Sequence, residues 1–332
     1  MDCTKGLKLK EVSVLLRDDF NAGPTTLNEI EPKLWIGNLT AATDLEALEK
    51  YKINHILTVD SCPLPKSIVM GPGIKTKFIQ VTDNPREDLL SYFEDTFEFI
   101  KAGQEDGAVL VHCYFGMSRS PAVVIAYMMK KYCLSYDDAF EIVKSKRNVT
   151  MPNQGFQLQL QLYHVMGWKI DKKNLQFRLF RLQIAAENVK KVKILPKSCA
   201  DVVKPDPGLI TVRPEPLVYC CRKCRRIVAS ASNLLPHIAK EKPLWTDNKW
   251  SLPNELDVCT LTYFVEPLAW MKVVTNSQQG KLYCPKCNAK LGSFSWTMGC
   301  QCPCGSKISP AFYFVPSKVE WSNIVQNVQV TV

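Results

Sequence analysis

The chain has 332 residues, 46% of them hydrophobic and 22% charged, which is typical of a globular protein of about two domains. Its formal net charge of +10 is uneven, because residues 171–332 hold 23 Lys/Arg against 11 Asp/Glu, whereas the first 170 residues hold the other 19 basic and 21 acidic side chains. The second half is therefore expected either to meet a polyanion or acidic surface, or to be a soluble basic domain without such a partner.

Targeting signals and disulfides are not expected. No apolar run reaches the ~18 uncharged residues of a membrane helix, and residues 1–19 mix charges without the apolar core of a signal peptide. These features favour a reducing, intracellular setting. There, fourteen cysteines indicate metal and thiol chemistry rather than disulfides.

Strands and helices are expected to alternate along the first half, after a poorly specified leader that closes at Gly23-Pro24. This alternation predicts a mostly parallel sheet flanked by helices. The expected strands are 34–37, 53–59, 77–81 and 108–111. The expected helices begin near Thr43 or Asp44 and then span 88–102, 121–130, 135–146 and 153–167.

The second half changes character twice. Residues 174–189 have apolar positions at helical spacing and predict an amphipathic helix between two domains. Residues 190–216 are rich in proline and lysine and predict a linker. From Leu217 onward, short aromatic segments are interrupted by cysteines. These segments predict a small β-rich domain that needs a metal to complete its core.

A phosphate-binding loop is predicted where the apolar run Ala108–Val111 is followed by Cys113, Gly116 and Arg119 and then by a helix. A strand, a glycine-containing loop and a helix N-terminus aim backbone N–H groups at an anion. The same N-terminus and the guanidinium stabilise a thiolate, and thiols so placed titrate roughly between 3.5 and 7.5. Arg119 offers a planar fork for two phosphate oxygens. The pattern indicates a phosphate cradle with a nucleophile at its floor.

From His112 to Ser120 the sequence resembles the protein tyrosine phosphatase superfamily, and the ending Ser118-Arg119-Ser120 resembles its dual-specificity branch. The segments 32–37 and 153–160 are similar to the opening strand and closing helix of that branch. The resemblance implies an α/β, protein tyrosine phosphatase-like fold. It also implies a cysteine-dependent phosphatase that works without a cofactor.

The motif and its chemistry suggest a role for each loop residue. Cys113 attacks phosphorus and forms a phosphocysteine. Ser120 is expected to donate a hydrogen bond to the Cys113 sulfur, and His112 to orient the loop by bonding to backbone. Backbone N–H groups and the guanidinium bind the equatorial oxygens, where charge spreads in the transition state. The predicted phosphate-binding residues are Tyr114, Phe115, Gly116, Met117, Ser118 and Arg119.

The departing phenol or alkoxide needs a proton, which a carboxylic acid must supply. Asp83 lies in a turn after the expected strand 77–81, thirty residues before Cys113, and matches the general-acid loop of the branch. Asp88 is the alternative. It directly precedes an apolar helical pattern, so an N-cap is the role we expect for it.

The loop residues also indicate which class of substrate is expected. Tyr114, Phe115 and Met117 stand where phosphoinositide-directed relatives carry lysines, which disfavours a lipid head group. No long tyrosine-bearing recognition loop is evident, so a shallow pocket for phosphotyrosine and phosphoserine/threonine is expected. The bulk of Tyr114 and Phe115 leaves the peptide preference open. An RNA 5′-phosphatase is a further alternative, but the loop lacks the basic residues expected for a triphosphate.

Seven cysteines and one histidine in the tail have the number and spacing for two tetrahedral zinc sites. Closed four-ligand sites are expected to be structural, and their pairing, sequential or interleaved, is left open. Cys220 or Cys300 could replace a neighbour, and His237 could be a surface side chain. Cys3, Cys62, Cys133 and Cys199 are expected to be ordinary thiols. The predicted ligands are Cys221, Cys224, His237, Cys259, Cys284, Cys287, Cys302 and Cys304.

Taken with these motifs, segments 219–226, 259–267, 284–294 and 310–312 resemble the zinc-binding dual-specificity phosphatases found across eukaryotes. The resemblance implies residence in nucleus and cytoplasm. It also implies a role in maturation of the large (60S) ribosomal subunit, carried by the zinc domain and largely separable from catalysis. The expected partners are phosphoproteins and a pre-60S particle, which the basic zinc domain would bind through rRNA or ribosomal protein. No membrane is expected to take part, and the catalytic domain is expected to be monomeric.

These interpretations divide the chain into five segments. They are a flexible leader at 1–27, a phosphatase catalytic domain at 28–170, a bridging helix and linker at 171–216, a zinc-binding domain at 217–315 and a C-terminal tail at 316–332.

Overall fold

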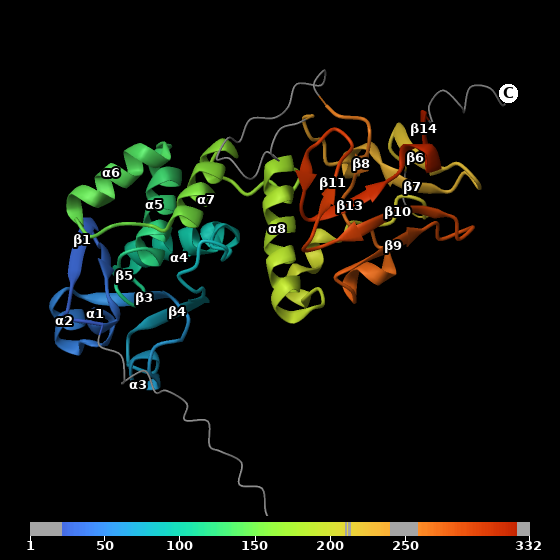
Figure 1. Ribbon diagram of the computed structural model, residues 1–332. Coiled ribbons are helices and arrows are strands. Elements are labelled where there is room, and N and C mark those ends of the chain that lie inside the picture. Colours follow the sequence, from blue (N-terminus) through green and yellow to red (C-terminus); the bar gives the residue numbers. More distant parts are fainter. Residues whose placement is uncertain (1–21, 210, 212–213, 240–257, 324–332) are drawn as a thin grey trace, which may run out of the picture. The chain divides into compact units, whose positions relative to one another are not determined.

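The computed structural model describes residues 22–209, 211, 214–239 and 258–323 (Figure 1). The chain forms two compact units. The first takes the segments up to Thr82, Asp95–Val124 and Phe140–Pro152, and the second takes Asp83–Glu94, Ile125–Ala139 and the chain from Asn153 onward. Cys3 and most of the predicted leader lie outside the described residues. Within the described part, no helix is both long and apolar enough to cross a membrane.

The first unit is built on a five-stranded sheet in the order β1-β2-β5-β3-β4. Strands β2, β5, β3 and β4 run parallel, and β1 pairs antiparallel with β2. The predicted, mostly parallel sheet is therefore confirmed. All five residues of β5 are buried, as expected for the central strand of a sheet covered on both faces. The strands are β1 Leu27–Glu31, β2 Leu34–Gly37, β3 Ile53–Asp60, β4 Lys75–Gln80 and β5 Ala108–His112.

The helices around this sheet begin where the sequence offers caps. Asp44 accepts a hydrogen bond from the backbone N–H of Ala47 at 3.0 Å and starts α2, as predicted. The helix expected from residue 88 starts later, because a 3₁₀ turn, η2 at Leu90–Tyr92, comes before it. The helices are α1 Leu39–Thr43, α2 Leu45–Lys50, α3 Lys66–Val69, α4 Phe93–Asp106, α5 Arg119–Tyr132 and α6 Tyr136–Lys146.

From Asn153 onward, the described part of the second unit combines two α-helices with small antiparallel sheets. Helix α7 spans Gln154–Val165 and begins at Asn153, whose side chain accepts the N–H of Phe156, and helix α8 spans Leu175–Val192. The sheets have the orders β8-β13-β10-β9, β14-β6-β7 and β11-β12. Their strands are β6 Leu217–Cys221, β7 Ile227–Ser230, β8 Tyr263–Phe264, β9 Gln279–Tyr283, β10 Lys290–Ser295, β11 Cys300–Gln301, β12 Lys307–Ile308, β13 Ala311–Phe314 and β14 Val319–Asn323.

One hydrophobic core joins α8 to these sheets. Leu182 and Val189 of α8 belong to the same buried cluster as Trp296 and Phe312. The 3₁₀ segment η3, Lys197–Val202, adds further apolar side chains to it. The β-rich region therefore has a larger core than its own strands led us to expect, because a segment predicted as bridging helix and linker completes it. Strand β14, which falls in the predicted tail, pairs with β6.

Candidate functional site

The candidate catalytic loop begins where the central strand ends. His112 is the last residue of β5, lies opposite Gly37 and Thr58 on the flanking strands, and is fully buried. Its Nε2 lies 2.8 Å from the Thr58 hydroxyl oxygen. This bond ties the ring to β3. That His112 orients the loop stays a prediction.

Four consecutive carbonyl groups of the loop accept hydrogen bonds from neighbouring segments. The backbone N–H of Leu39 donates to the carbonyl of Tyr114 at 3.0 Å, and the N–H of Met151 donates to that of Met117 at 2.7 Å. Arg147 donates to the two carbonyls between them. Because N–H and C=O point in opposite directions across a trans peptide, the N–H groups of residues 115–118 face the other side of the loop. A run of N–H groups on one side is what an anion cradle requires.

Gly116 is required by the shape of this loop. Its φ is +68°, in the left-handed region that side chains rarely adopt. A Cβ at this position would lie 2.5 Å from the carbonyl oxygen of Gly37 and 2.7 Å from a guanidinium nitrogen of Arg147. The loop therefore needs glycine here for conformation and for space.

The side chains of Cys113 and Ser120 meet below this loop. Ser120 is fully buried in the first turn of α5, and its hydroxyl donates to the Cys113 sulfur at 3.2 Å. Arg119 begins the same helix and is 6% exposed. Its Nη1 donates to the Asp60 carboxylate at 2.6 Å and to the carbonyl of Val81 at 3.3 Å. The structure thus brings a thiol and a hydroxyl together at the N-terminus of the helix that Arg119 begins.

The two candidate acids have different surroundings. Asp83 is exposed in the segment after β4, and its carboxylate accepts a hydrogen bond from the Asn153 side chain at 2.7 Å. Asp88 accepts the N–H and the hydroxyl of Ser91 and forms an ion pair with Arg181. Capping of this kind is the role expected for Asp88. The assignment of Asp83 as proton donor stays a prediction.

Three residues that the sequence analysis did not single out contact the predicted ones. Arg147 is 2% exposed, holds the loop carbonyls and reaches back to the side chains of Thr26 and Asn28. Asp60 pairs with Arg119, and Asn153 bonds to Asp83. Only Asn153 carried a local signal, because it belongs to the segment similar to the closing helix. The partners of the other two lie far away in sequence.

The structure also gathers the eight predicted metal ligands into two groups of four. One holds Cys221, Cys224, Cys284 and Cys287, and the other holds His237, Cys259, Cys302 and Cys304. Within each group the ligand atoms lie within 4.8 Å of one another, close enough for all four to bind one metal ion. The pairing left open by the sequence is therefore interleaved. Neither group includes Cys220 or Cys300.

The first group forms at two turns with the same backbone pattern. The N–H of Cys221 bonds to the carbonyl of Arg226 at 2.8 Å, and the N–H of Cys284 bonds to that of Ala289 at 2.9 Å. In each turn the residue four positions after the first cysteine has a positive φ, +63° at Arg225 and +55° at Asn288. Such turns direct both thiols of a Cys-x-x-Cys pair to the same side.

The pKa values of these thiols differ, and a bound cation would allow all of them to be ionised together. Burial raises the pKa of the Cys284 thiol to about 12, whereas a hydrogen bond from the backbone of Ala289 lowers that of Cys287 to about 7. In the second group, burial raises the pKa of Cys259 to about 11. Four thiolates cannot share so small a space without a positive charge, and a bound metal ion supplies one.

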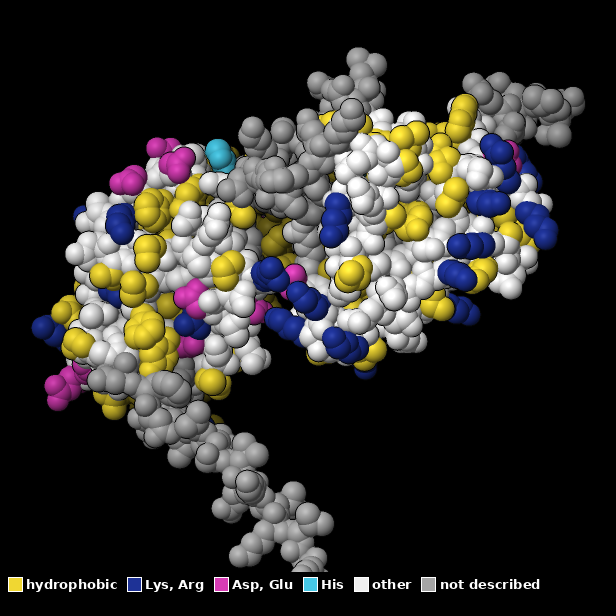
Figure 2. All heavy atoms as spheres, in the orientation of Figure 1, with side chains coloured by type: hydrophobic (Ala, Val, Ile, Leu, Met, Phe, Trp, Pro, Cys, Tyr) yellow, Lys and Arg dark blue, Asp and Glu magenta, His cyan; other side chains and the backbone are white. Residues whose placement is uncertain are grey.

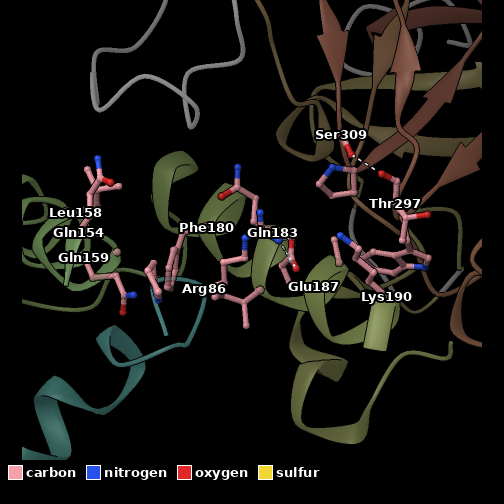
Figure 3. A pocket seen from close by; sticks show the side chains of 16 residues that line it. Arg86, Gln154, Leu158, Gln159, Phe180, Gln183, Glu187, Lys190, Thr297 and Ser309 are labelled. Carbon is pink, nitrogen blue, oxygen red and sulfur yellow. Dashed lines mark hydrogen bonds and ion pairs between the residues drawn. The ribbon is translucent and has the colours of Figure 1, made fainter. Parts of the chain in front are cut away.

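A separate cavity of about 630 Å³ lies within the second unit (Figure 3). Its lining includes Leu158 of α7, Phe180 of α8 and an ion pair in which Arg86 and Glu187 approach to 3.1 Å. None of the predicted catalytic, phosphate-binding or metal-binding residues is among the residues that line it. The cavity is therefore distinct from both candidate sites.

The parallel sheet and the loop after its central strand define a cysteine-dependent phosphatase of the protein tyrosine phosphatase class. Residues 34–166 match the family described as dual specificity phosphatase, catalytic domain. The chain is 43% identical to dual specificity protein phosphatase MPK-4 of Drosophila melanogaster, over 98% of this chain and 96% of that protein. It is 36% identical to dual specificity protein phosphatase 12 of Mus musculus, over 88% and 87% of the two chains.

The chain therefore belongs to the dual-specificity protein phosphatase family. Among solved structures, human DUSP28 aligns at 37% identity over 43% of this chain and 96% of its own, with a TM-score of 0.40. As an enzyme of this family the protein acts on phosphoproteins.

Proposed function

We propose that this phosphatase hydrolyses phosphotyrosine and phosphoserine/threonine through a phosphocysteine on Cys113. The hydrogen bond from Ser120 to the Cys113 sulfur carries the proposal, because a hydroxyl donated to sulfur stabilises the thiolate that attacks and later leaves. The outward-facing carbonyls of residues 114–117 support the same reading, since they leave the N–H groups to bind phosphate oxygens.

The reaction has two steps. The Cys113 thiolate forms a bond to phosphorus while the bond to the substrate oxygen breaks, and Asp83 gives its proton to the departing oxygen. A water then attacks phosphorus and gives a proton to Asp83, which releases inorganic phosphate and the thiolate. Arg119 and the loop N–H groups hold the equatorial oxygens in both steps.

The direct test replaces the nucleophile. Cys113→Ser is expected to abolish turnover of para-nitrophenyl phosphate and of phosphopeptides while retaining their binding. Cys62→Ser, which alters an exposed thiol, is the matched control and should match the wild type. Retained turnover in Cys113→Ser would overturn the proposal.

We further propose that each group of four ligands holds a structural zinc ion. In a tetrahedron with Zn–S bonds of about 2.3 Å, the sulfur atoms lie about 3.8 Å apart. Three Sγ–Sγ distances are close to this value: 3.7 Å for Cys221 and Cys287, 3.5 Å for Cys224 and Cys284, and 3.7 Å for Cys259 and Cys302. Thiolate and imidazole ligands favour zinc in this geometry. Metal analysis of the purified protein should find two zinc ions per chain, and a different metal or stoichiometry would contradict this.

A second candidate function is maturation of the large ribosomal subunit through the metal-binding region, with catalysis secondary and with residence in nucleus and cytoplasm. Charge favours it. Exposed basic residues lie close in sequence to the cysteines of the first metal group, and Figure 2 shows Lys and Arg gathered on the visible face of the second unit. Such a surface suits RNA or an acidic protein. The exposed basic residues near this group are Arg222, Lys223, Arg225, Lys286 and Lys290.

Full-length variants separate the two functions. In cells that lack the protein, Cys113→Ser should restore assembly, whereas Lys223→Glu/Lys286→Glu should fail and should no longer sediment with large-subunit precursors. Lys66→Glu/Lys101→Glu is the charge-matched control on exposed residues of the first unit. Failure of Cys113→Ser to restore assembly would make catalysis the main role. If the Lys223→Glu/Lys286→Glu protein still sediments with large-subunit precursors, the basic surface does not mediate the binding.

A further inference from the structure

Asp60 is a buried carboxylate beside the phosphate loop. It is the last residue of β3, next to the central strand, and only 4% of its surface is exposed. Burying a carboxylate is costly unless it is paired and hydrogen-bonded. An acidic group at this place is also unexpected, because it adds negative charge close to a site built for phosphate.

The partner of Asp60 is Arg119. The carboxylate oxygen that accepts from Arg119 Nη1 at 2.6 Å also accepts the N–H of Ser61 at 2.7 Å. The two side chains are 5% and 7% exposed. The same nitrogen of Arg119 donates to the carbonyl of Val81 at 3.3 Å. One end of the guanidinium is thus fixed by residues at the ends of two adjacent parallel strands.

This anchoring is compatible with binding of phosphate. A guanidinium has three nitrogens, and a bidentate grip on phosphate uses two of them. Holding Nη1 from β3 therefore fixes the plane and direction of the fork without requiring it to leave Asp60 when substrate arrives. A long side chain that is ordered in advance does not lose its rotamer freedom at the moment of binding.

We propose that Asp60 is a positioning residue for the reaction, which acts by holding Arg119 in the orientation that receives the phosphoryl group. The inference rests on the role proposed for Arg119. It gives the carboxylate a function that its charge alone would not suggest: orientation of the fork outweighs the repulsion between Asp60 and the bound anion.

The test compares Asp60→Ala and Asp60→Asn with the wild type by turnover of para-nitrophenyl phosphate and by calorimetric binding of tungstate, an oxyanion that needs no chemical step. Asp60→Ala should weaken tungstate binding and kcat/KM by about tenfold to a hundredfold, as expected for loss of a hydrogen bond to a charged group. Asp60→Asn keeps an acceptor and should show a smaller loss. Asp95→Asn removes the exposed partner of Lys77 and should change neither quantity.

A double-mutant cycle ties the effect to Arg119. In an Arg119→Lys background, Asp60→Asn should cost much less than in the wild type, because the fork that it orients is gone. If the folded Asp60→Ala variant bound tungstate with unchanged affinity, the ion pair between Asp60 and Arg119 would serve only stability, and the inference would be overturned. Tighter tungstate binding would overturn it too and make Asp60 a competitor for Arg119. Because tungstate binding does not depend on turnover, an inactive wild-type protein would contradict the proposed function and not this inference.

Discussion

Arg147 shows how much of the phosphate loop depends on a residue outside the loop. It donates at 2.8 Å to the Gly116 carbonyl and at 2.6 Å to the Asn28 side chain, and it is nearly inaccessible to solvent. Burial lowers the pKa of Arg147, while negative charge on Cys113 raises it. A negative charge on Cys113 therefore favours the charged form of Arg147.

Replacing Arg147 should weaken both stability and catalysis. Arg147→Met leaves buried carbonyls without a donor, which we expect to lower the free energy of unfolding by about 2–4 kcal/mol and to lower kcat. Arg147→Lys keeps the charge but not the planar fork, so it should retain only part of the stability and of the kcat. Lys146→Met, at an exposed position, is the control. Urea unfolding and aryl phosphate turnover measure the two effects, and wild-type behaviour of Arg147→Met would contradict this account.

Substrates with different leaving groups can show which of the two candidate residues, Asp83 or Asp88, is the general acid. Asp83→Asn should slow hydrolysis of a phenyl phosphate far more than that of an activated nitrophenyl ester, because only the poorer leaving group needs the proton. Asp88→Asn should reduce stability slightly, since Asp88 caps a turn and pairs with Arg181, and should leave this dependence unchanged. Equal slowing of both substrates by Asp83→Asn would place the acid elsewhere.

The local sequence was sufficient to predict the residues of the phosphate loop, but not the distant residues that hold them in place. Cys113, Gly116, Arg119 and Ser120 lie within one short motif whose spacing carries the chemistry. Asp60 meets Arg119 across 59 positions of sequence, a contact that only the pairing of β3 with β5 creates. No pattern near such a residue predicts a partner so distant.

At the scale of elements, the predictions succeeded where a cap or a buried run marks a boundary. The strand at β5 and the starts of α2 and α7 are where the sequence indicated. Strand β1 was not predicted, because only one of its five residues is buried and no alternation marks it. Segment η3 was assigned to a linker, since its prolines and lysines hide the few apolar residues that it buries.

Gly116, in the loop between β5 and α5, and Gly73, between α3 and β4, offer a matched pair of glycine substitutions. Gly116 and Gly73 both have positive φ, +68° and +78°, but a Cβ on Gly73 meets nothing within 4 Å. Gly73→Ala should cost only backbone strain, about 1–2 kcal/mol. Gly116→Ala should cost more and abolish turnover, because its Cβ displaces Gly37 or Arg147. Thermal unfolding and para-nitrophenyl phosphate assays check both. Similar behaviour of the two variants would show that space around Gly116 does not matter.

At the scale of the whole molecule, the metal ligands could be counted from sequence but not paired. Cys221 and Cys224 share a group with Cys284 and Cys287 because the turns that carry them are brought together in the folded second unit, although two ligands of the other group, His237 and Cys259, lie between them in sequence. The core that surrounds them was underestimated for a similar reason, since α8 contributes from outside the cysteine-bearing region.

Removing one ligand should remove one metal ion. Cys224→Ser is expected to lower the zinc content from two ions per chain to one and to lower the unfolding temperature of the second unit. Cys220→Ser changes a neighbouring thiol outside both groups and should leave the content at two. Aryl phosphate turnover should persist in both variants, because no metal ligand lies in the phosphate loop. Loss of turnover in step with loss of zinc would tie the metal to catalysis.

The most direct test of the central claim is to trap the covalent intermediate. Without the Ser120 hydroxyl the Cys113 thiolate leaves phosphorus more slowly, so Ser120→Ala should accumulate phosphocysteine. After a rapid acid quench during turnover of a phosphotyrosine peptide, peptide mass spectrometry should find one phosphoryl group on Cys113 in Ser120→Ala and none in Cys113→Ser. Turnover with the phosphoryl group on another residue, or with no phosphorylated enzyme in the quenched variant, would contradict the account.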